Sequence, residues 1–151
     1  MILEADANAN AVATLDQNAR IKIPKGMIGL PDATEFELVA SEESLPIMWL
    51  RSVGDDHLNF PVVEPGPFVP NYELDLNDAD ADFLGDLAAP TQPPLVLTVL
   101  TVKSLTPQKA TINLIGPIVV NRETLVGKQV ILANSERYSV EYPVIDESSS
   151  S

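Results

Sequence analysis

Thirteen prolines and seven glycines interrupt this chain of 151 residues throughout its length. Proline cannot donate a backbone hydrogen bond and glycine favours turns, so neither residue suits the interior of a long helix or strand. The chain is therefore divided into short segments, a pattern that favours short β-strands joined by tight turns. Since the length suits one domain and 45% of the residues are hydrophobic, these segments are expected to enclose a normal core.

Several of these segments have the residue pattern of a β-strand. Residues 95–102 are apolar at nearly every position, which predicts a central strand whose two faces are both covered. Residues 35–39 alternate between polar and apolar side chains, which predicts a strand with one buried face. The other segments of strand-forming composition are residues 11–15, 47–53, 60–63, 110–120, 129–133 and 138–144.

One short helix is predicted at residues 78–87. Asn77 can cap its first turn, where Asp78 and Asp80 favour the positive end of the helix dipole. The patterns together predict a mostly β fold, a small antiparallel β-barrel-like single domain with this one helix. We expect a weakly ordered lead-in over residues 1–19, the β domain over residues 20–145 and a polar tail over residues 146–151.

The charge of the chain is strongly negative and unevenly distributed. Asp and Glu number 22 against nine Lys and Arg, a formal net charge of −13. No Lys or Arg occurs in residues 52–102, which contain nine of the acidic residues. Such a surface argues against direct binding to nucleic acid and against docking on an anionic membrane. It favours a basic protein partner.

Residues that could carry chemistry are few. The chain has no cysteine and one histidine, His57, which excludes thiolate and His-rich metal sites. The acidic residues at 78, 80 and 82 have the spacing of a calcium loop, but Phe83 and Ala89 stand where that loop needs Gly and Glu. His57 follows two aspartates in a polar run and is interpreted as a surface residue. The sequence therefore predicts no enzyme activity, no metal and no cofactor.

Two aromatic residues are assigned by their surroundings. Trp49 lies between Met48 and Leu50 in an apolar segment. A binding anchor is one interpretation, since tryptophan is enriched at interfaces, but we expect Trp49 to pack in the core. Tyr72 follows proline-rich turns at the border of the acidic stretch, where an exposed or half-exposed aromatic is expected. No apolar run is long enough to span a membrane, and no basic segment precedes the first apolar residues, so a cytoplasmic protein is expected.

The order of short motifs in residues 21–143 resembles the FliW family of flagellar assembly factors. The motifs are Ile-Lys-Ile-Pro-Lys-Gly-Met-Ile-Gly-Leu-Pro from residue 21, Pro-Ile-Met-Trp-Leu-Arg-Ser-Val from 46, Phe-Pro-Val-Val-Glu-Pro from 60, Asn-Leu-Ile-Gly-Pro-Ile-Val-Val-Asn from 113 and Gly-Lys-Gln-Val-Ile-Leu from 127. The residues that carry the resemblance most clearly are Trp49, Ser52, Pro65, Asn113, Pro117, Asn121, Gly127, Lys128 and Gln129.

This resemblance implies a non-catalytic protein that binds flagellin and antagonises CsrA, an RNA-binding translational regulator. In that family, flagellin occupies FliW until flagellin is secreted, and free FliW then restrains CsrA and relieves repression of flagellin translation. The antagonism implied is allosteric, because it acts away from the RNA-binding face of CsrA. A negative surface would attract such a basic regulator.

We therefore expect the regulator-facing surface to lie in the acidic stretch. The candidate partner-binding residues are Tyr72, Asp75, Asp78, Asp80, Asp82 and Asp86. Three alternatives to this role stay open on the residues alone. The chain could be a small-ligand-binding β-barrel, which a deep apolar cavity would favour. It could be another acidic protein-interaction module, or a carboxylate-dependent enzyme, which would require two acids converging in a cleft.

Overall fold

The computed structural model describes residues 1–7, 19–41, 43–54, 58–85, 87 and 93–146 of the chain. Its described part is mostly β-sheet, with one α-helix and one short 3-10 helix. The first strands are β1 (Ile2–Glu4), β2 (Ala19–Lys22), β3 (Glu35–Val39), β4 (Met48–Ser52), β5 (Asn59–Val63) and β6 (Glu73–Asp75). They are followed by α2 (Asp78–Leu84), β7 (Leu95–Leu105), β8 (Gln108–Ile112), β9 (Ile118–Val120), β10 (Gly127–Gln129), η1 (Ser135–Arg137) and β11 (Tyr142–Asp146).

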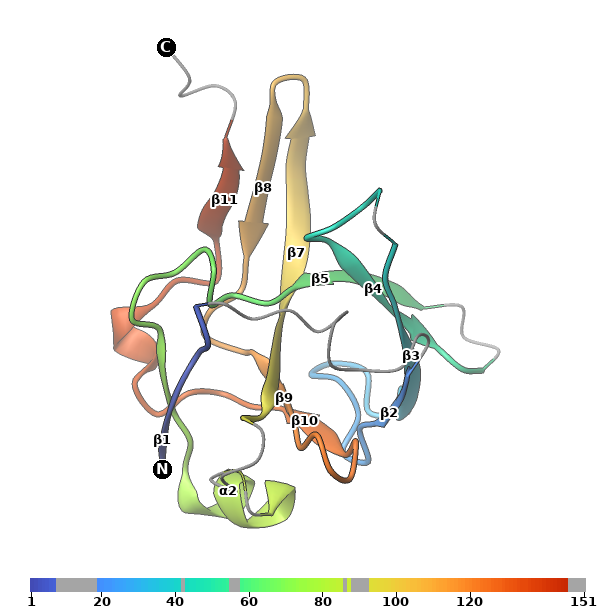
Figure 1. The fold of residues 1–151 in the computed structure, drawn as a ribbon, viewed down its shortest axis with the longest axis vertical. Helices are drawn as coiled ribbons and strands as arrows, with labels where there is room; N and C mark the ends of the chain where they lie inside the picture. Colours follow the sequence, from blue (N-terminus) through green and yellow to red (C-terminus); the bar gives the residue numbers. More distant parts are fainter. Residues whose placement is uncertain (8–18, 42, 55–57, 86, 88–92, 147–151) are drawn as a thin grey trace.

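A nine-stranded antiparallel sheet forms the body of the molecule (Figure 1). Its strands follow the order β10-β9-β7-β5-β4-β3-β2, while β8 pairs with β7 and β11 pairs with β8. A separate two-stranded sheet joins β1 to β6, also antiparallel. The predicted fold, a small antiparallel β domain with one short helix, is therefore confirmed.

The two ends of the nine-stranded sheet approach each other at a single point. The amide of Lys22 in β2 donates to the carbonyl of Leu125, in the turn before β10, at 3.0 Å. Lys22 and Val126 form an isolated parallel bridge there, and no ladder extends from it in the described residues. The sheet therefore curves like a barrel without closing into one.

Two hydrophobic cores lie on opposite faces of the sheet, and β5 and β7 separate them. Val62 of β5 belongs to one core and its neighbour Val63 to the other. In β7, Leu97 and Val96 are divided between the cores in the same way. Because consecutive side chains of a strand point to opposite faces, a strand between two cores must be apolar at consecutive positions. This arrangement confirms the predicted central strand over residues 95–100, whereas Thr101 and Val102 at the end of the predicted range are exposed.

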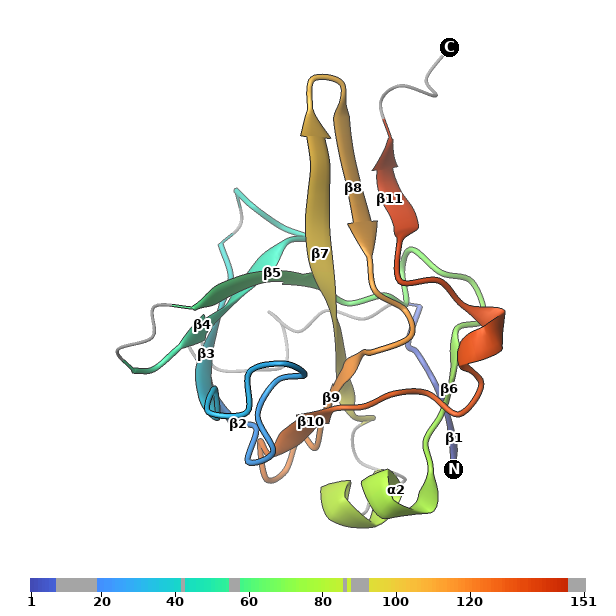
Figure 2. The same ribbon diagram turned by 180° about the vertical axis from the view of Figure 1, so that it is seen from behind.

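The outer part of β7 extends beyond the body. From Leu100 to Leu105 it pairs with β8, and β11 pairs with the other edge of β8. Figures 1 and 2 show these three strands projecting together, and we call them the β7–β8–β11 arm. Val102 and Leu105 of this arm are exposed, so the arm contributes little apolar burial at its tip.

The helix is capped as predicted but is shorter. The side-chain oxygen of Asn77 accepts a hydrogen bond from the amide of Asp80 at 2.8 Å, which satisfies one of the free donors of the first turn. Gly85 adopts a φ of 82°, a backbone conformation that glycine tolerates and that stops the helix at Leu84. The predicted helix over residues 78–87 is therefore too long by three residues at its end.

Other predicted boundaries are wrong for local reasons. The strand predicted over residues 110–120 is two strands, β8 and β9, because the side chain of Asn113 accepts from the amides of Ile115 and Gly116 and folds a turn between them. The strand predicted over residues 138–144 begins only at Tyr142, after η1. The sequence patterns do not predict strands β1, β2 and β6, and the predicted strand over residues 11–15 lies outside the described residues.

Candidate partner-binding site

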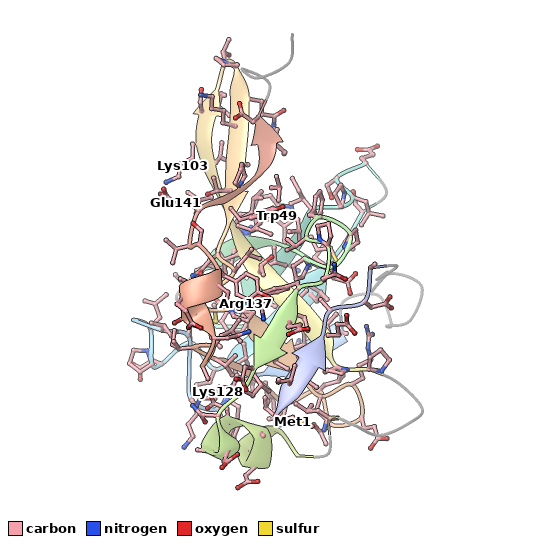
Figure 3. All side chains as sticks on the ribbon, turned by 90° about the vertical axis from the view of Figure 1, so that its left-hand side faces the viewer. Met1, Trp49, Lys103, Lys128, Arg137 and Glu141 are labelled. Atoms are coloured by element: carbon pink, nitrogen blue, oxygen red, sulfur yellow. The ribbon has the colours of Figure 1, made fainter. Side chains whose placement is uncertain are left out.

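Helix α2 presents two of the predicted carboxylates to solvent and buries a third. Asp78 and Asp82 are exposed. Asp80 is 4% exposed and forms an ion pair with Lys128 of β10. Asp80 was predicted at the partner-facing surface, and that expectation of exposure is wrong. The reason is helical spacing, because Asp80 precedes Leu84 by four residues and both therefore lie on the buried face of the helix. Figure 3 shows Lys128 beside the helix.

The end of α2 is held by the turn between β9 and β10. The side-chain amide of Asn121 donates to the carbonyl of Leu84 at 3.0 Å. Its oxygen accepts from the amides of Glu123 at 2.9 Å and Thr124 at 3.3 Å, which fixes the turn itself. Asn121 is buried, so these bonds occur away from competing water. Two residues of the family motifs, Asn121 and Lys128, thus fix the helix that carries the acidic surface.

Lys25 adds a third contact to α2. Its ammonium lies 5.5 Å from the centre of the Phe83 ring, within the range of a cation–π interaction. Lys25 belongs to the connection between β2 and β3, so three separate segments of the chain contact this helix. We call the exposed side chains of Asp78 and Asp82 the acidic helix face.

Tyr72 is not at the surface, contrary to its predicted exposure. Its side chain is fully buried and its hydroxyl donates to the carbonyl of Leu114. Tyr138 packs edge-to-face against it, with ring centres 4.9 Å apart. Burial, with a smaller contribution from Tyr138, raises the pKa of the Tyr72 hydroxyl above its ordinary range, so it remains a proton donor at neutral pH. Tyr72, Leu74 and Leu76 alternate with acidic residues, a period-two pattern that could have predicted this burial.

The remaining predicted partner-binding residues are Asp75 and Asp86. Asp75 is half-buried in β6, and the amino group of Met1 lies 3.7 Å from one of its carboxylate oxygens. Its carbonyl also accepts from the amide of Ala133 at 2.7 Å. Asp86 lies outside the described residues. The structure therefore brings together Asp78, Asp80 and Asp82 on one helix, and of these three only Asp78 and Asp82 are exposed.

Gln129 of β10 connects the family motifs that begin at residues 21, 113 and 127. Its side-chain oxygen accepts from the amide of Ile28 at 2.9 Å, and its nitrogen donates to the carbonyl of Gly116 at 3.1 Å. Asn113 folds the turn that presents Gly116. Pro117 follows as a buried residue whose carbonyl accepts from Val130 at 2.9 Å. These hydrogen bonds hold β10 against the β2–β3 connection and against the turn before β9.

Three further motif residues have structural contacts of the same kind. Gly127 pairs with Val120, and a side-chain carbon at this glycine would lie 2.8 Å from Val120 Cγ2. The hydroxyl oxygen of Ser52 accepts from the amide of Leu58 at 3.2 Å. Pro65 is buried, and its carbonyl accepts from the amides of two residues in the following turn. Each of these contacts fixes a turn or a strand pair.

Trp49 differs from the other motif residues. It was predicted to pack in the core, but it lies at the surface. It is 37% exposed, while Met48 and Leu50 on either side are buried. Strand β4 alternates between buried and exposed positions, so Trp49 and Arg51 share its outer face. The alternation in the sequence Met-Trp-Leu-Arg could have predicted this outward orientation.

Candidate metal centres and membrane-spanning helices were sought in the described part of the chain. No group of three or more His, Cys, Asp or Glu side chains there is placed to hold a metal ion. No helix in that part is long and apolar enough to cross a membrane. The carboxylates of α2 do not converge, since Asp80 turns inward to Lys128 while Asp78 and Asp82 face outward.

The fold and this surface define an antiparallel β protein whose acidic helix is fixed by side chains of the turn between β9 and β10 and of β10 itself, and comparisons with known proteins give its family. The family model described as "FliW protein" matches residues 5–144. The "Flagellar assembly factor FliW" of Bacillus subtilis (strain 168) is 36% identical over 128 residues, which cover 85% of this chain and 87% of that protein. The protein of the same name from Thermosipho africanus (strain TCF52B) is 31% identical over 128 residues, covering 85% and 86%.

A solved structure agrees with these relatives. The "Crystal structure of the flagellar assembly factor FliW" superposes with a TM-score of 0.71 at 29% sequence identity and covers 88% of this chain and 90% of that chain. The chain belongs to the FliW family of flagellar assembly factors. The resemblance drawn from the sequence motifs is therefore confirmed.

Proposed function

We propose that this FliW-family chain binds flagellin and a CsrA-type RNA-binding regulator in the cytoplasm, and that it antagonises the regulator without catalysis. Flagellin and the regulator compete for the chain, so that flagellin export frees the chain to restrain the regulator and to relieve repression of flagellin translation. Family membership supports the flagellar role, and the acidic helix face is the observation that carries the choice of a basic partner.

The acidic helix face suits a basic partner because its carboxylates are held in fixed positions. Asp78 and Asp82 are exposed on a helix whose first turn is fixed by Lys128 and whose last carbonyl is fixed by Asn121. A preorganised pair of charges costs less conformational entropy on binding than charges on a free loop. The net charge of −13 adds long-range attraction for a basic surface.

The first experiment measures association with the purified CsrA-type regulator of the same organism by stopped-flow mixing at several salt concentrations. The variant Asp78→Lys with Asp82→Lys should associate about tenfold more slowly at low salt, and its rate should depend less on salt. The matched control is Glu43→Lys with Glu141→Lys, which changes the net charge equally. Glu43 lies in the connection between β3 and β4, and Glu141 is paired with Lys103 on the arm, far from α2 (Figures 1 and 3). Equal rates for the two double variants would contradict the proposal.

A second experiment separates antagonism from binding. The chain is added to a complex of the regulator with its target RNA, and RNA release is followed by gel shift. We expect release by the wild-type chain, weaker release by the Asp78→Lys, Asp82→Lys variant, and reversal when monomeric flagellin is added. Binding of neither purified partner would instead favour a different acidic protein-interaction module.

The small-ligand alternative receives no support from the described cavities. A pocket lined by Glu64, Pro93 and Arg122 has a volume of about 20 Å³, which suits one water molecule. Its walls include the charged side chains of Glu64 and Arg122, 3.9 Å apart, so it is not the apolar cavity that a small-ligand barrel would need. A ligand of drug-like size needs several hundred Å³.

A further inference from the structure

The outer face of strands β3, β4 and β5 carries an apolar row centred on Trp49. Val39 of β3 and Pro61 of β5 lie directly opposite Trp49 in the register of the sheet. Directly opposite residues of antiparallel strands point to the same face, so these three side chains lie side by side. Trp49 is nevertheless 37% exposed, which leaves part of a large apolar ring in water. No described contact of the fold explains this exposure.

A row of charges lies next to the apolar row on the same face. Arg20 of β2, Glu37 of β3 and Arg51 of β4 are neighbours in register. The carboxylate of Glu37 pairs with both arginines, at 3.3 Å to Arg20 and 3.0 Å to Arg51. Two guanidinium groups thus share one carboxylate, and their side chains are 61% and 55% exposed. The row is locally positive within a chain of net charge −13.

These two rows, formed by Arg20, Glu37, Val39, Trp49, Arg51 and Pro61, are here called the tryptophan face. Tryptophan and arginine are the residues most enriched at the centres of protein interfaces. Each exposed arginine has N–H donors that Glu37 does not occupy, and a planar guanidinium binds carboxylates with two parallel hydrogen bonds. The face therefore combines an apolar anchor with unfilled positions for carboxylates.

We infer that the tryptophan face is a second protein-binding surface, which takes an acidic segment of another protein with an apolar side chain against Trp49. It is separate from the acidic helix face, since Figure 3 shows Trp49 near the base of the arm and Lys128 beside α2. This surface goes beyond the proposed function, which assigns a binding surface only to the basic regulator. One chain could then hold a basic partner and an acidic segment at the same time.

Two other occupants fit the face less well. Single-stranded RNA stacks its bases on tryptophan and arginine, but the net charge of −13 repels phosphates. A second copy of the chain, docked by two-fold symmetry, would bring four arginines and only two carboxylates of the charge row into one interface. An acidic protein segment carries fewer charges than RNA of the same length, so the net charge repels it less, and its carboxylates can be spaced to meet Arg20 and Arg51.

The test selects peptides of twelve residues from a random display library on the immobilised full-length chain. Selected peptides should be rich in Asp and Glu around one aliphatic or aromatic residue. Trp49 is the single tryptophan, so its fluorescence should shift to shorter wavelength when unlabelled peptides without tryptophan bind. Labelled peptides, followed by fluorescence anisotropy, should bind Trp49→Ser at least about tenfold more weakly.

Two variants separate binding from folding. Glu37→Gln frees both arginines and should bind the acidic peptides about threefold more tightly, a gain that a damaged fold would not give. Leu105→Ser, at an 80% exposed position on the arm, should bind them like the wild type. Trp49→Ser should associate with the CsrA-type regulator at the wild-type rate. A failure of this inference, seen as unchanged peptide binding, is therefore distinguishable from a failure of the proposed function, seen as absent regulator binding.

The inference is overturned by any of four results. Selected peptides could lack acidic residues, or could bind Trp49→Ser and Leu105→Ser equally well. An oligouridylate could bind the face more tightly than the acidic peptides. Sedimentation could show a dimer of the wild-type chain that Trp49→Ser abolishes, which would make the face a contact between copies.

Discussion

The acidic helix face and the tryptophan face are positioned by different kinds of interaction. Helix α2 has seven residues, too few to be stable by itself, and it depends on side chains from distant segments such as Lys128 and Asn121. The tryptophan face lies on strands joined by backbone ladders, and its own ion pairs are exposed. Partner-binding residues on α2 are therefore expected to be more sensitive than those on the sheet to mutations at positions distant in the sequence.

The largest loss of stability is expected when the buried carboxylate of Asp80 loses its counter-ion. Lys128→Met leaves Asp80 buried with no cation and should lower the free energy of unfolding by about 3 kcal/mol. The control is Arg137→Met, which breaks the exposed pair with Glu73 and should cost less than about 1 kcal/mol. Urea denaturation of both variants measures the difference. Equal losses would show that the Asp80–Lys128 pair does not hold the helix.

The segment that leads into α2 is anchored by Tyr72. Tyr72→Phe removes the donor to the carbonyl of Leu114, and the free energy of unfolding should fall by about 1.5 kcal/mol at pH 7. The control Tyr142→Phe removes only a 3.4 Å contact to Phe68 and should change little.

The same variant gives a test by pH. The folded state raises the pKa of Tyr72, so the stability that depends on its neutral hydroxyl is fully present below the unfolded value of about 10 and is lost as the pH rises above it. The stability difference between wild type and Tyr72→Phe should therefore narrow above about pH 10, as measured by denaturation at pH 7 and pH 10.5. A constant difference would contradict the assigned burial of the hydroxyl.

A smaller effect is expected at the start of the helix. Asn77→Ala removes the acceptor for the amide of Asp80 and should cost about 1 kcal/mol in thermal or chemical unfolding. Asn77→Asp retains a side-chain acceptor at the cap and should preserve most of this stability. If both variants lose the same amount, the cap does not contribute through its hydrogen bond.

The smallest effect is expected on the sheet. Arg51→Gln breaks one exposed ion pair and should change the free energy of unfolding by less than about 0.5 kcal/mol. The measurement is the urea midpoint of the variant beside that of wild type. A loss comparable to that of Lys128→Met would erase the contrast between the two faces.

The sequence predicted the features that depend on local pattern. The strand over residues 35–39, the central strand and the Asn77 cap all follow from alternation, from continuous apolar composition or from capping chemistry. The motif order also predicted the family. The prediction of one strand over residues 110–120 is wrong because the side-chain hydrogen bonds of Asn113 compete with the β-ladder and fold a turn.

The candidate site was predicted less well, because composition says which residues are charged but not which way they point. Asp80 is turned inward by a lysine 48 residues away, and no local pattern names that partner. Trp49 and Tyr72 were assigned by their neighbours, whereas the period-two alternation of β4 and of the segment from Tyr72 to Leu76 decides their burial. The sharing of Glu37 by two arginines depends on the pairing of three strands.

Hydrogen exchange of the chain with and without the purified CsrA-type regulator tests the central claim most directly. We predict that amides of the peptide covering residues 76–85 exchange more slowly in the complex, while those of β4 are unchanged. Protection confined to other segments, with α2 exchanging at its free rate, would contradict the assignment of the acidic helix face as the surface that binds the regulator.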